Sequence, residues 1–160
     1  LRARFDVAPH RIVAGGVERF HSVLNGINAL SSEVEYIAVH DGVRALVTKR
    51  LIIRAMLAVE EHDAVIPVVD VVDSYRRVEG DDSYIVPRSE LRIVQTPQIF
   101  KAQLLRDAYN VEFSPAFTDD ASVVEAFGGH ITLVEGERTN IKITTPEDIT
   151  LAESFLNLLK

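Results

Sequence analysis

Apolar residues along the chain recur with two spacings that alternate. Helical spacing, with apolar positions three or four residues apart, follows Glu18 and Thr48. Short apolar runs typical of buried strands lie at 35–40 and 64–69, with a shorter one at 11–14. Strands that alternate with helices are typical of a mostly parallel sheet with helices on both faces, so we predict a three-layer α/β fold.

Residues 73–95 depart from this pattern. Polar and apolar residues alternate there around the turn signal Glu79-Gly80-Asp81-Asp82 without a helical period, so we predict an antiparallel β-arm that protrudes from the sheet. An arm of this kind needs a partner surface. It also carries four arginines, whose positive charge in an acidic chain points to an anion: Arg76, Arg77, Arg88 and Arg92.

The chain after the arm continues with helices and strands. Helices are predicted from about 101 to 111 and after Thr118, and a strand at 131–134. Thr145 and Pro146 suit the start of a last helix. Its apolar face would consist of Ile149, Ala152, Phe155, Leu156 and Leu159. No linker rich in Pro, Gly or Ser divides the chain, so residues 1–160 are predicted to form a single domain.

Composition narrows the class of protein. The chain has 160 residues, 47% of them hydrophobic, which is enough for one core. It contains no Cys, which excludes disulfides and Cys-ligated zinc and favours a cytoplasmic location. Acidic residues outnumber basic ones by 24 to 17, and the net charge of −7 disfavours nucleic acids and anionic membranes as partners. No apolar run approaches the roughly 20 residues that cross a bilayer, and the five His show no metal-ligand spacing.

One segment places polar groups where α/β proteins bind ligands. The buried strand predicted at 35–40 is followed by Asp41, Gly42 and Arg44. In open α/β sheets, ligands bind just beyond the carboxyl ends of strands, and the planar guanidinium of Arg is suited to a phosphate. An ion pair at the surface explains the same residues equally well.

Three further segments are ambiguous when each is taken alone. Gln95-Thr96-Pro97-Gln98 is consistent with a turn that leads into a helix. Thr118-Asp119-Asp120 could place carboxylates near a metal ion, but a helix cap is the favoured interpretation. Lys142 lies in an extended, mostly apolar stretch and is typical of a solvated side chain.

Taken together, five segments share a pattern with one enzyme family. They are Gly15-Gly16-x-x-Arg19-x-x-Ser22-Val23, Val39-His40-Asp41-x-x-Arg44, Gln95-Thr96-Pro97-Gln98-x-Phe100, Thr118-Asp119-Asp120-Ala121-Ser122 and Asn140-x-Lys142-Ile143-Thr144-Thr145-Pro146-Glu147-Asp148. In this order they resemble the 2-C-methyl-D-erythritol 4-phosphate cytidylyltransferase family of isoprenoid synthesis, and the similarity extends through essentially all of the chain. The resemblance implies a Rossmann-like nucleotidyltransferase sheet.

The resemblance also implies a reaction. CMP is transferred from CTP to 2-C-methyl-D-erythritol 4-phosphate with release of pyrophosphate, a step of the non-mevalonate pathway. The substrate phosphate oxygen attacks the α-phosphorus of CTP, and Mg²⁺ is held mainly through the CTP phosphates. Because charge builds on the phosphoryl oxygens, positioning and electrostatic stabilisation would do most of the catalysis.

Site residues follow from the same resemblance. Arg88 and Lys142 match positions that hold and orient the methylerythritol phosphate for attack. Contacts with this substrate are implied for Asp41, Arg44, Ser74 and Thr96, and contacts with the nucleotide for Gly16, Ser22 and Gly42. No protein ligand for the metal is implied. In the family the arm reaches across a homodimer, so residues 73–95 would help to complete the partner's site.

Part of the family pattern has no counterpart in the sequence. The opening strand, the Gly-rich loop with its Arg, and the Pro-Lys-Gln segment with the catalytic Lys are missing, so we expect an N-terminally incomplete member without the triphosphate cradle. Two alternatives stay open. One is ribitol 5-phosphate cytidylyltransferase, a sister activity with similar motifs. The other is a catalytically inert dimeric fragment that retains only the polyol-phosphate site.

Overall fold

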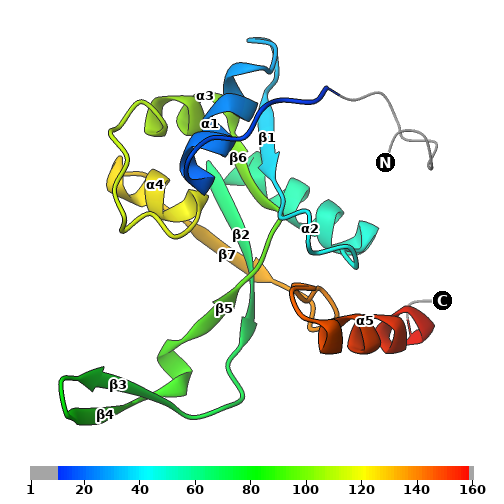
Figure 1. Cartoon of the computed structure of the whole chain (residues 1–160). Helices are drawn as coiled ribbons and strands as arrows, with labels where there is room; N and C mark the ends of the chain where they lie inside the picture. Colours follow the sequence, from blue (N-terminus) through cyan, green and yellow to red (C-terminus); the bar gives the residue numbers. More distant parts are fainter. Residues whose placement is uncertain (1–10, 159–160) are drawn as a thin grey trace.

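A five-stranded mixed sheet lies at the centre of the molecule in the computed structural model, which describes residues 11–158 (Figure 1). Four of its strands follow the order β1 (Tyr36–Val39), β6 (Gln98–Lys101), β2 (Ala64–Asp70) and β5 (Arg92–Val94). The fifth, β7 (Thr132–Glu135), pairs with the opposite edge of β2. The α/β class is therefore confirmed.

The prediction of a mostly parallel sheet is wrong. Only β2 and β7 pair in parallel, whereas β6 runs antiparallel to both of its neighbours and β5 runs antiparallel to β2. The difference lies at residues 95–100, whose sequence is consistent with a turn that leads into a helix. Residues 98–101 instead form the short strand β6 between β1 and β2, and Gln98, Ile99 and Phe100 are completely buried there.

Helices cover both faces of the sheet. On one face, Ile99 and Val65 pack against α2 (Lys49–Glu61). On the other face, the next side chain along β6, Phe100, joins a core with residues of α1 (Arg19–Asn28), α3 (Ala102–Ala108) and α4 (Asp120–Ala126). Successive side chains of a strand point to opposite faces, so one short strand contributes to both cores. Figure 1 shows the resulting three layers.

Two helix starts follow the capping signals in the sequence. The Thr48 hydroxyl accepts the backbone N–H of Leu51 at 3.1 Å at the start of α2. Asp119 and Ser122 form a reciprocal capping box at the start of α4. Each side chain satisfies backbone donors that would have no partner within the helix.

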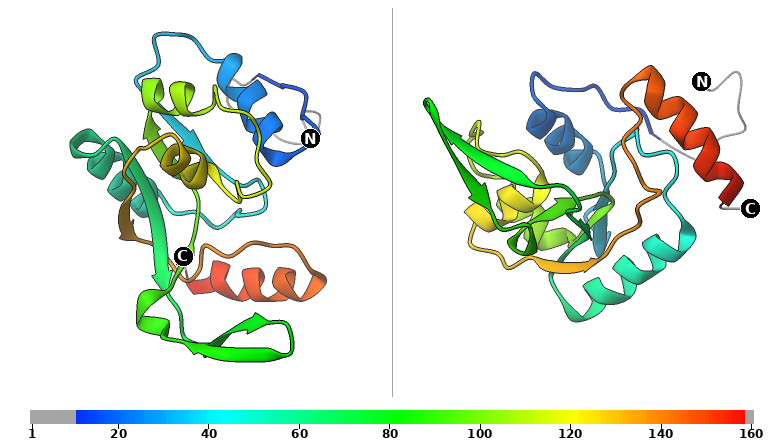
Figure 2. Two further views of the ribbon diagram at one scale, coloured as in Figure 1. Left: turned by 90° about the vertical axis from the view of Figure 1, so that its left-hand side faces the viewer. Right: turned by 90° about the horizontal axis from the view of Figure 1, so that it is seen from below.

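The predicted β-arm is confirmed as a two-stranded hairpin. Strand β3 (Tyr75–Glu79) pairs antiparallel with β4 (Asp82–Val86), and Gly80 adopts a φ of 61° in the turn. Glycine has no Cβ, so it takes this left-handed conformation without strain. A short 3₁₀ helix, η1 (Arg88–Glu90), follows, and residues 92–94 rejoin the main sheet as β5. Figures 1 and 2 show the hairpin projecting from the body.

Two predicted elements differ from the structure. Residues 11–14 are not a strand. The last helix, α5 (Pro146–Leu158), starts as predicted, but only Ala152 of its apolar face is buried, whereas Ile149 is 53% and Leu156 is 47% exposed. Leu159 lies outside the described residues. Within residues 11–158, no helix combines the length and the apolar character needed to cross a membrane.

Candidate functional site

A pocket of about 300 Å³ lies beyond the end of β1. Segments that are far apart in the sequence meet there, as the position at a strand end predicts. Its lining residues are Arg19, Asp41, Arg44, Val94, Gln95, Thr96, Gln98, Thr118, Asp119 and Lys142. Four of the predicted site residues, Asp41, Arg44, Thr96 and Lys142, are thus brought together.

Three cations surround the carboxylate of Asp41. Lys142 Nζ lies 3.0 Å from Oδ2, Arg44 Nε lies 3.5 Å from the same oxygen, and an Arg19 nitrogen lies 3.6 Å from Oδ1. Partial burial acts to raise the pKa of Asp41, but the hydrogen bond and charge of Lys142 and the charges of Arg19 and Arg44 outweigh it, so the pKa lies below its ordinary value. Asp41 is therefore an ionised group that accepts hydrogen bonds.

The Arg44 guanidinium has a fixed orientation. Its Nη1 donates to the backbone oxygen of Asn140 at 2.6 Å, and its Nη2 donates to the backbone oxygen of Val94 at 3.2 Å. Arg44 is only 6% exposed, and burial lowers its pKa although Asp41 acts in the opposite direction. These contacts join the turn after β1 to the end of β5 and to the segment that carries Lys142.

Thr96 links two sides of the pocket. Its hydroxyl accepts the backbone N–H of Asp41 at 3.0 Å and lies 2.9 Å from Nδ1 of His40. Its backbone oxygen accepts a hydrogen bond from the buried Asn140 amide at 2.8 Å. The side chain of His40 in turn lies 3.2 Å from the backbone oxygen of Arg44. Sequence reasoning predicted Thr96 but gave no role to His40 or Asn140.

Arg19 is held by a fully buried carboxylate. Its two terminal nitrogens donate to the two oxygens of Asp120 at 3.0 and 2.7 Å, and the Tyr109 hydroxyl donates to Asp120 at 2.6 Å. Asp120 has no exposed surface, whereas 39% of the Arg19 side chain is exposed. Burial and then the charge of Asp120 raise the pKa of Tyr109, so its hydroxyl stays protonated.

Asp119, the neighbour of Asp120, is also committed to the fold. One oxygen caps α4 by accepting the N–H of Ser122 at 2.9 Å, and the other accepts the Gln98 amide at 2.8 Å. The interpretation of this segment as a helix cap is thus confirmed. The sequence did not reveal that Asp119 and Gln98 also line the pocket, because nothing local shows that α4 starts beside β6.

Other predicted site residues do not line this pocket. Arg88 and Ser74 are exposed at the base of the arm, and Arg88 donates to the backbone oxygen of Val72 at 2.9 Å. The backbone N–H of Gly16 donates to the Ser22 hydroxyl at 2.9 Å, which orders the turn before α1. Gly42 lies in the turn that the Arg44 N–H closes onto the Asp41 oxygen.

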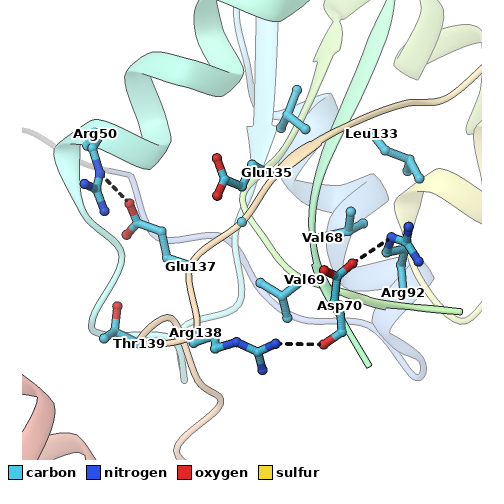
Figure 3. A pocket seen from close by; sticks show the side chains of 12 residues that line it. Arg50, Val68, Val69, Asp70, Arg92, Leu133, Glu135, Glu137, Arg138 and Thr139 are labelled. Atoms are coloured by element: carbon cyan, nitrogen blue, oxygen red, sulfur yellow. Dashed lines mark hydrogen bonds and ion pairs between the residues drawn. The ribbon is translucent and has the colours of Figure 1, made fainter. Parts of the chain in front are cut away.

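A larger hollow, of about 710 Å³, lies beside β7 and contains charges that pair with one another. Figure 3 shows Arg50 with Glu137, and Arg92 with Asp70. The Glu137 carboxylate also accepts the Thr48 hydroxyl at 2.8 Å, so it ties the loop after β7 to the start of α2. We attribute a structural role to these pairs and regard the Asp41 pocket as the candidate site.

Comparison with known proteins identifies the family. The sequence profile of 2-C-methyl-D-erythritol 4-phosphate cytidylyltransferase matches residues 4–158. The chain belongs to this family. The cytidylyltransferase of Bacteroides fragilis is 50% identical over 152 residues, which are 95% of this chain and 68% of that protein. The Bacillus cereus enzyme is 45% identical over 155 residues, again 68% of its length.

Solved structures of cytidylyltransferases share the fold. The Thermus thermophilus enzyme is 39% identical, with a TM-score of 0.77 over 89% of this chain and 71% of that one. The 4-diphosphocytidyl-2C-methyl-D-erythritol synthase of Anaerococcus prevotii is 32% identical, with a TM-score of 0.84 over 97% of this chain and 73% of that one. The protein is therefore a cytidylyltransferase of isoprenoid precursor synthesis, as the motifs predicted.

Proposed function

We propose that the Asp41 pocket is the acceptor half of the cytidylyltransferase site and holds the phosphate and hydroxyls of 2-C-methyl-D-erythritol 4-phosphate. The main support is that Arg19, Arg44 and Lys142 line one small pocket in a chain of net charge −7. Ammonium and guanidinium donors form strong, charge-assisted hydrogen bonds with phosphate. The ionised Asp41 among them is suited to accept hydrogen bonds from polyol hydroxyls.

The chemistry assigned to these residues is positioning. Lys142 is 52% exposed and can release Asp41 to contact a phosphate oxygen, whereas the buried Arg44 keeps its orientation. The held phosphate oxygen attacks the α-phosphorus of CTP, a new P–O bond forms, and pyrophosphate leaves. Fixing the nucleophile close to its target removes much of the entropic barrier.

Magnesium would be held mainly by the triphosphate. No group of three or more His, Cys, Asp or Glu residues suited to a metal ion occurs within residues 11–158. The nearby carboxylates already have partners, since Asp41 binds Lys142, and Asp119 binds Gln98 and caps α4. Metal-bound phosphates would supply charge neutralisation on the nucleotide side.

We place Gly16, Ser22 and Gly42 on the nucleotide side of the site. Gly16 and Ser22 flank Arg19 in sequence, and Gly42 follows Asp41.

Calorimetric titration tests the acceptor site. We expect the protein to bind methylerythritol phosphate more tightly than ribitol 5-phosphate, because the relatives named above act on the former. The full-length gene product is then incubated with CTP, Mg²⁺ and each polyol phosphate, and kcat/KM is compared from pyrophosphate release. Absence of both binding and turnover with methylerythritol phosphate would refute the assignment.

A cytoplasmic location stays a prediction from the lack of Cys.

We also propose that the arm mediates a homodimer. Its hairpin exposes Val78 at 71% and Ile85 at 63% on one face and Tyr84 at 54% on the other, apolar side chains that its own body leaves uncovered. Arg88 at its base does not line the Asp41 pocket of its own chain. These observations support an arrangement in which Arg88 contributes to the partner's pocket.

Mixing two inactive variants tests this arrangement. If Arg88 serves the partner, a dimer of one Arg88→Ala subunit and one Lys142→Ala subunit contains one intact site. Random reassociation should then restore about a quarter of the wild-type activity. If Arg88 serves its own subunit, no activity returns. Light scattering on the unmixed proteins establishes whether the dimer exists.

A further inference from the structure

His40 forms hydrogen bonds through both ring nitrogens at the edge of the pocket. Its Nδ1 lies 2.9 Å from the Thr96 hydroxyl, and its Nε2 lies 3.2 Å from the backbone oxygen of Arg44. Thr96 is 4% exposed and lines the pocket, whereas His40 is exposed to solvent. Protons from solvent can therefore reach the imidazole, and a change in its hydrogen bonding alters the Thr96 hydroxyl inside the pocket.

The direction of each hydrogen bond follows from the partners. The Asp41 N–H can only donate, so the Thr96 oxygen accepts at 3.0 Å. A carbonyl can only accept, so Nε2 of His40 donates to Arg44. A neutral imidazole has one N–H, so its Nδ1 must accept the single hydrogen of the Thr96 hydroxyl. In this state Thr96 has no hydrogen to donate into the pocket.

Protonation of His40 reverses one of these bonds. An imidazolium donates from both nitrogens, so Nδ1 would donate to the Thr96 oxygen, which then accepts from His40 and Asp41 together. The hydroxyl hydrogen of Thr96 is then free to turn toward an anion in the pocket. A phosphate has acceptor oxygens, so it favours the state in which Thr96 donates.

We infer that His40 is a positioning residue for the acceptor phosphate, because its protonation converts the Thr96 hydroxyl from an acceptor into a donor toward the bound anion. This inference rests on the proposed function of the Asp41 pocket. Anion binding should therefore be coupled to proton uptake at His40.

The charged neighbours of His40, Asp41 and Arg44, would not produce the same dependence of anion binding on pH. On the same turn, Arg44 is buried and Asp41 is held by Lys142 from the 140–144 segment. Asp41 has a pKa below its ordinary value, and Arg44 keeps its charge, so neither changes protonation between weakly acidic and weakly basic pH. Thr96, which comes from the loop between β5 and β6, carries no charge.

Inorganic sulfate is the probe, because it stays a dianion across this range whereas a phosphate monoester titrates. Its affinity is measured from the chemical shifts of the Asp41 and Thr96 backbone amides at about pH 5.5 and about pH 8.5. We expect binding to be about tenfold tighter at the lower pH, the gain of one charge-assisted hydrogen bond. His40→Asn retains a side-chain amide but cannot titrate, so it should remove the difference. His62→Asn, at the exposed end of α2, is the matched control and should keep it.

A second measurement reads the tautomer directly. Long-range ¹H–¹⁵N correlation of the free protein at the higher pH should show the proton of His40 on Nε2; a proton on Nδ1 would overturn the inference. Equal sulfate affinity at both pH values in the wild type would also overturn it, while binding of methylerythritol phosphate would leave the proposed function standing. If neither anion binds at either pH, the proposed function fails and this inference fails with it.

Discussion

The ammonium nitrogen of Lys142 lies 3.0 Å from a carboxylate oxygen of Asp41, although more than half of the chain separates the two residues. The contact joins the turn after β1 to the extended segment before α5. A backbone hydrogen bond of 2.8 Å from the Ile143 N–H to the Val43 oxygen runs beside it. The pair thus depends on a backbone connection between two loops, and it leaves a cation that can exchange Asp41 for a phosphate.

Replacing Lys142 by Gln should weaken the binding of methylerythritol phosphate by about 10- to 100-fold, since a hydrogen bond to a charged group is worth roughly 1.5–3 kcal/mol. Lys142→Arg keeps the charge and should retain part of the affinity. Arg106→Gln removes a cation that binds the Ser31 oxygen away from the pocket, and it should leave the affinity unchanged. Titration calorimetry measures the affinity of all three variants for methylerythritol phosphate. If Lys142→Gln binds it as tightly as the wild type does, the assignment of Lys142 is wrong.

The Asp41 carboxylate should make the fold sensitive to acid. Burial opposes ionisation, but Lys142 and the two arginines lower its pKa below the ordinary 3.8. A lowered folded-state pKa stabilises the fold above the ordinary value, and this stabilisation is lost as pH falls through the folded value. Asp41→Asn should therefore lower the free energy of unfolding at neutral pH, and the gap to wild type should close below about pH 4. Urea unfolding across this range measures the gap, and a gap that does not change with pH would count against the ion pairs.

The pair of Arg19 and Asp120 should respond asymmetrically to mutation. Arg19→Gln leaves a completely buried carboxylate without a cation, which costs about 3–5 kcal/mol. Asp120→Asn leaves a half-exposed arginine that water can solvate, and Asn still accepts the Tyr109 hydroxyl, so we expect about 1–2 kcal/mol. Denaturant unfolding of both variants shows which substitution lowers the free energy of unfolding more. The reverse order would contradict this account of the pair.

Two glycines near the proposed site should differ in their tolerance of a side chain. A Cβ on Gly16 would clash with the Cβ of His21, so the turn before α1 would have to move. Gly42 has open space around the same position. Gly16→Ala should therefore cost about 1–3 kcal/mol of stability, and Gly42→Ala close to nothing. Thermal unfolding distinguishes them, and equal midpoints would show that the turn adapts without cost.

Much of the fold could be predicted because its signals are local. The Thr48 cap, the Gly80 turn and the amphipathic stripe of α2 each depend on neighbours within a few residues. The position of β6 could not be predicted in this way. Its four residues form a strand because β1 and β2 supply hydrogen-bond partners on both sides, and those partners are far away in the sequence.

The residues of the candidate site also fall into two groups, those that local sequence signals identify and those that only folding brings together. Asp41 and Arg44 stand out as charges directly after a buried strand, and the order of five motifs identifies the family and, by resemblance, Thr96 and Lys142. By contrast, Asp120 has the local appearance of a residue in the first turn of a helix, although it is a buried partner of Arg19.

The sequence by itself determined the α/β class, the antiparallel arm, the helix starts and the family. Only the tertiary structure decided which way β5 and β6 run, which carboxylate holds Arg19, and that His40 contacts the Thr96 hydroxyl. Patterns and caps are properties of neighbouring residues, whereas strand pairing, burial and the direction of a hydrogen bond depend on groups that only folding brings within reach.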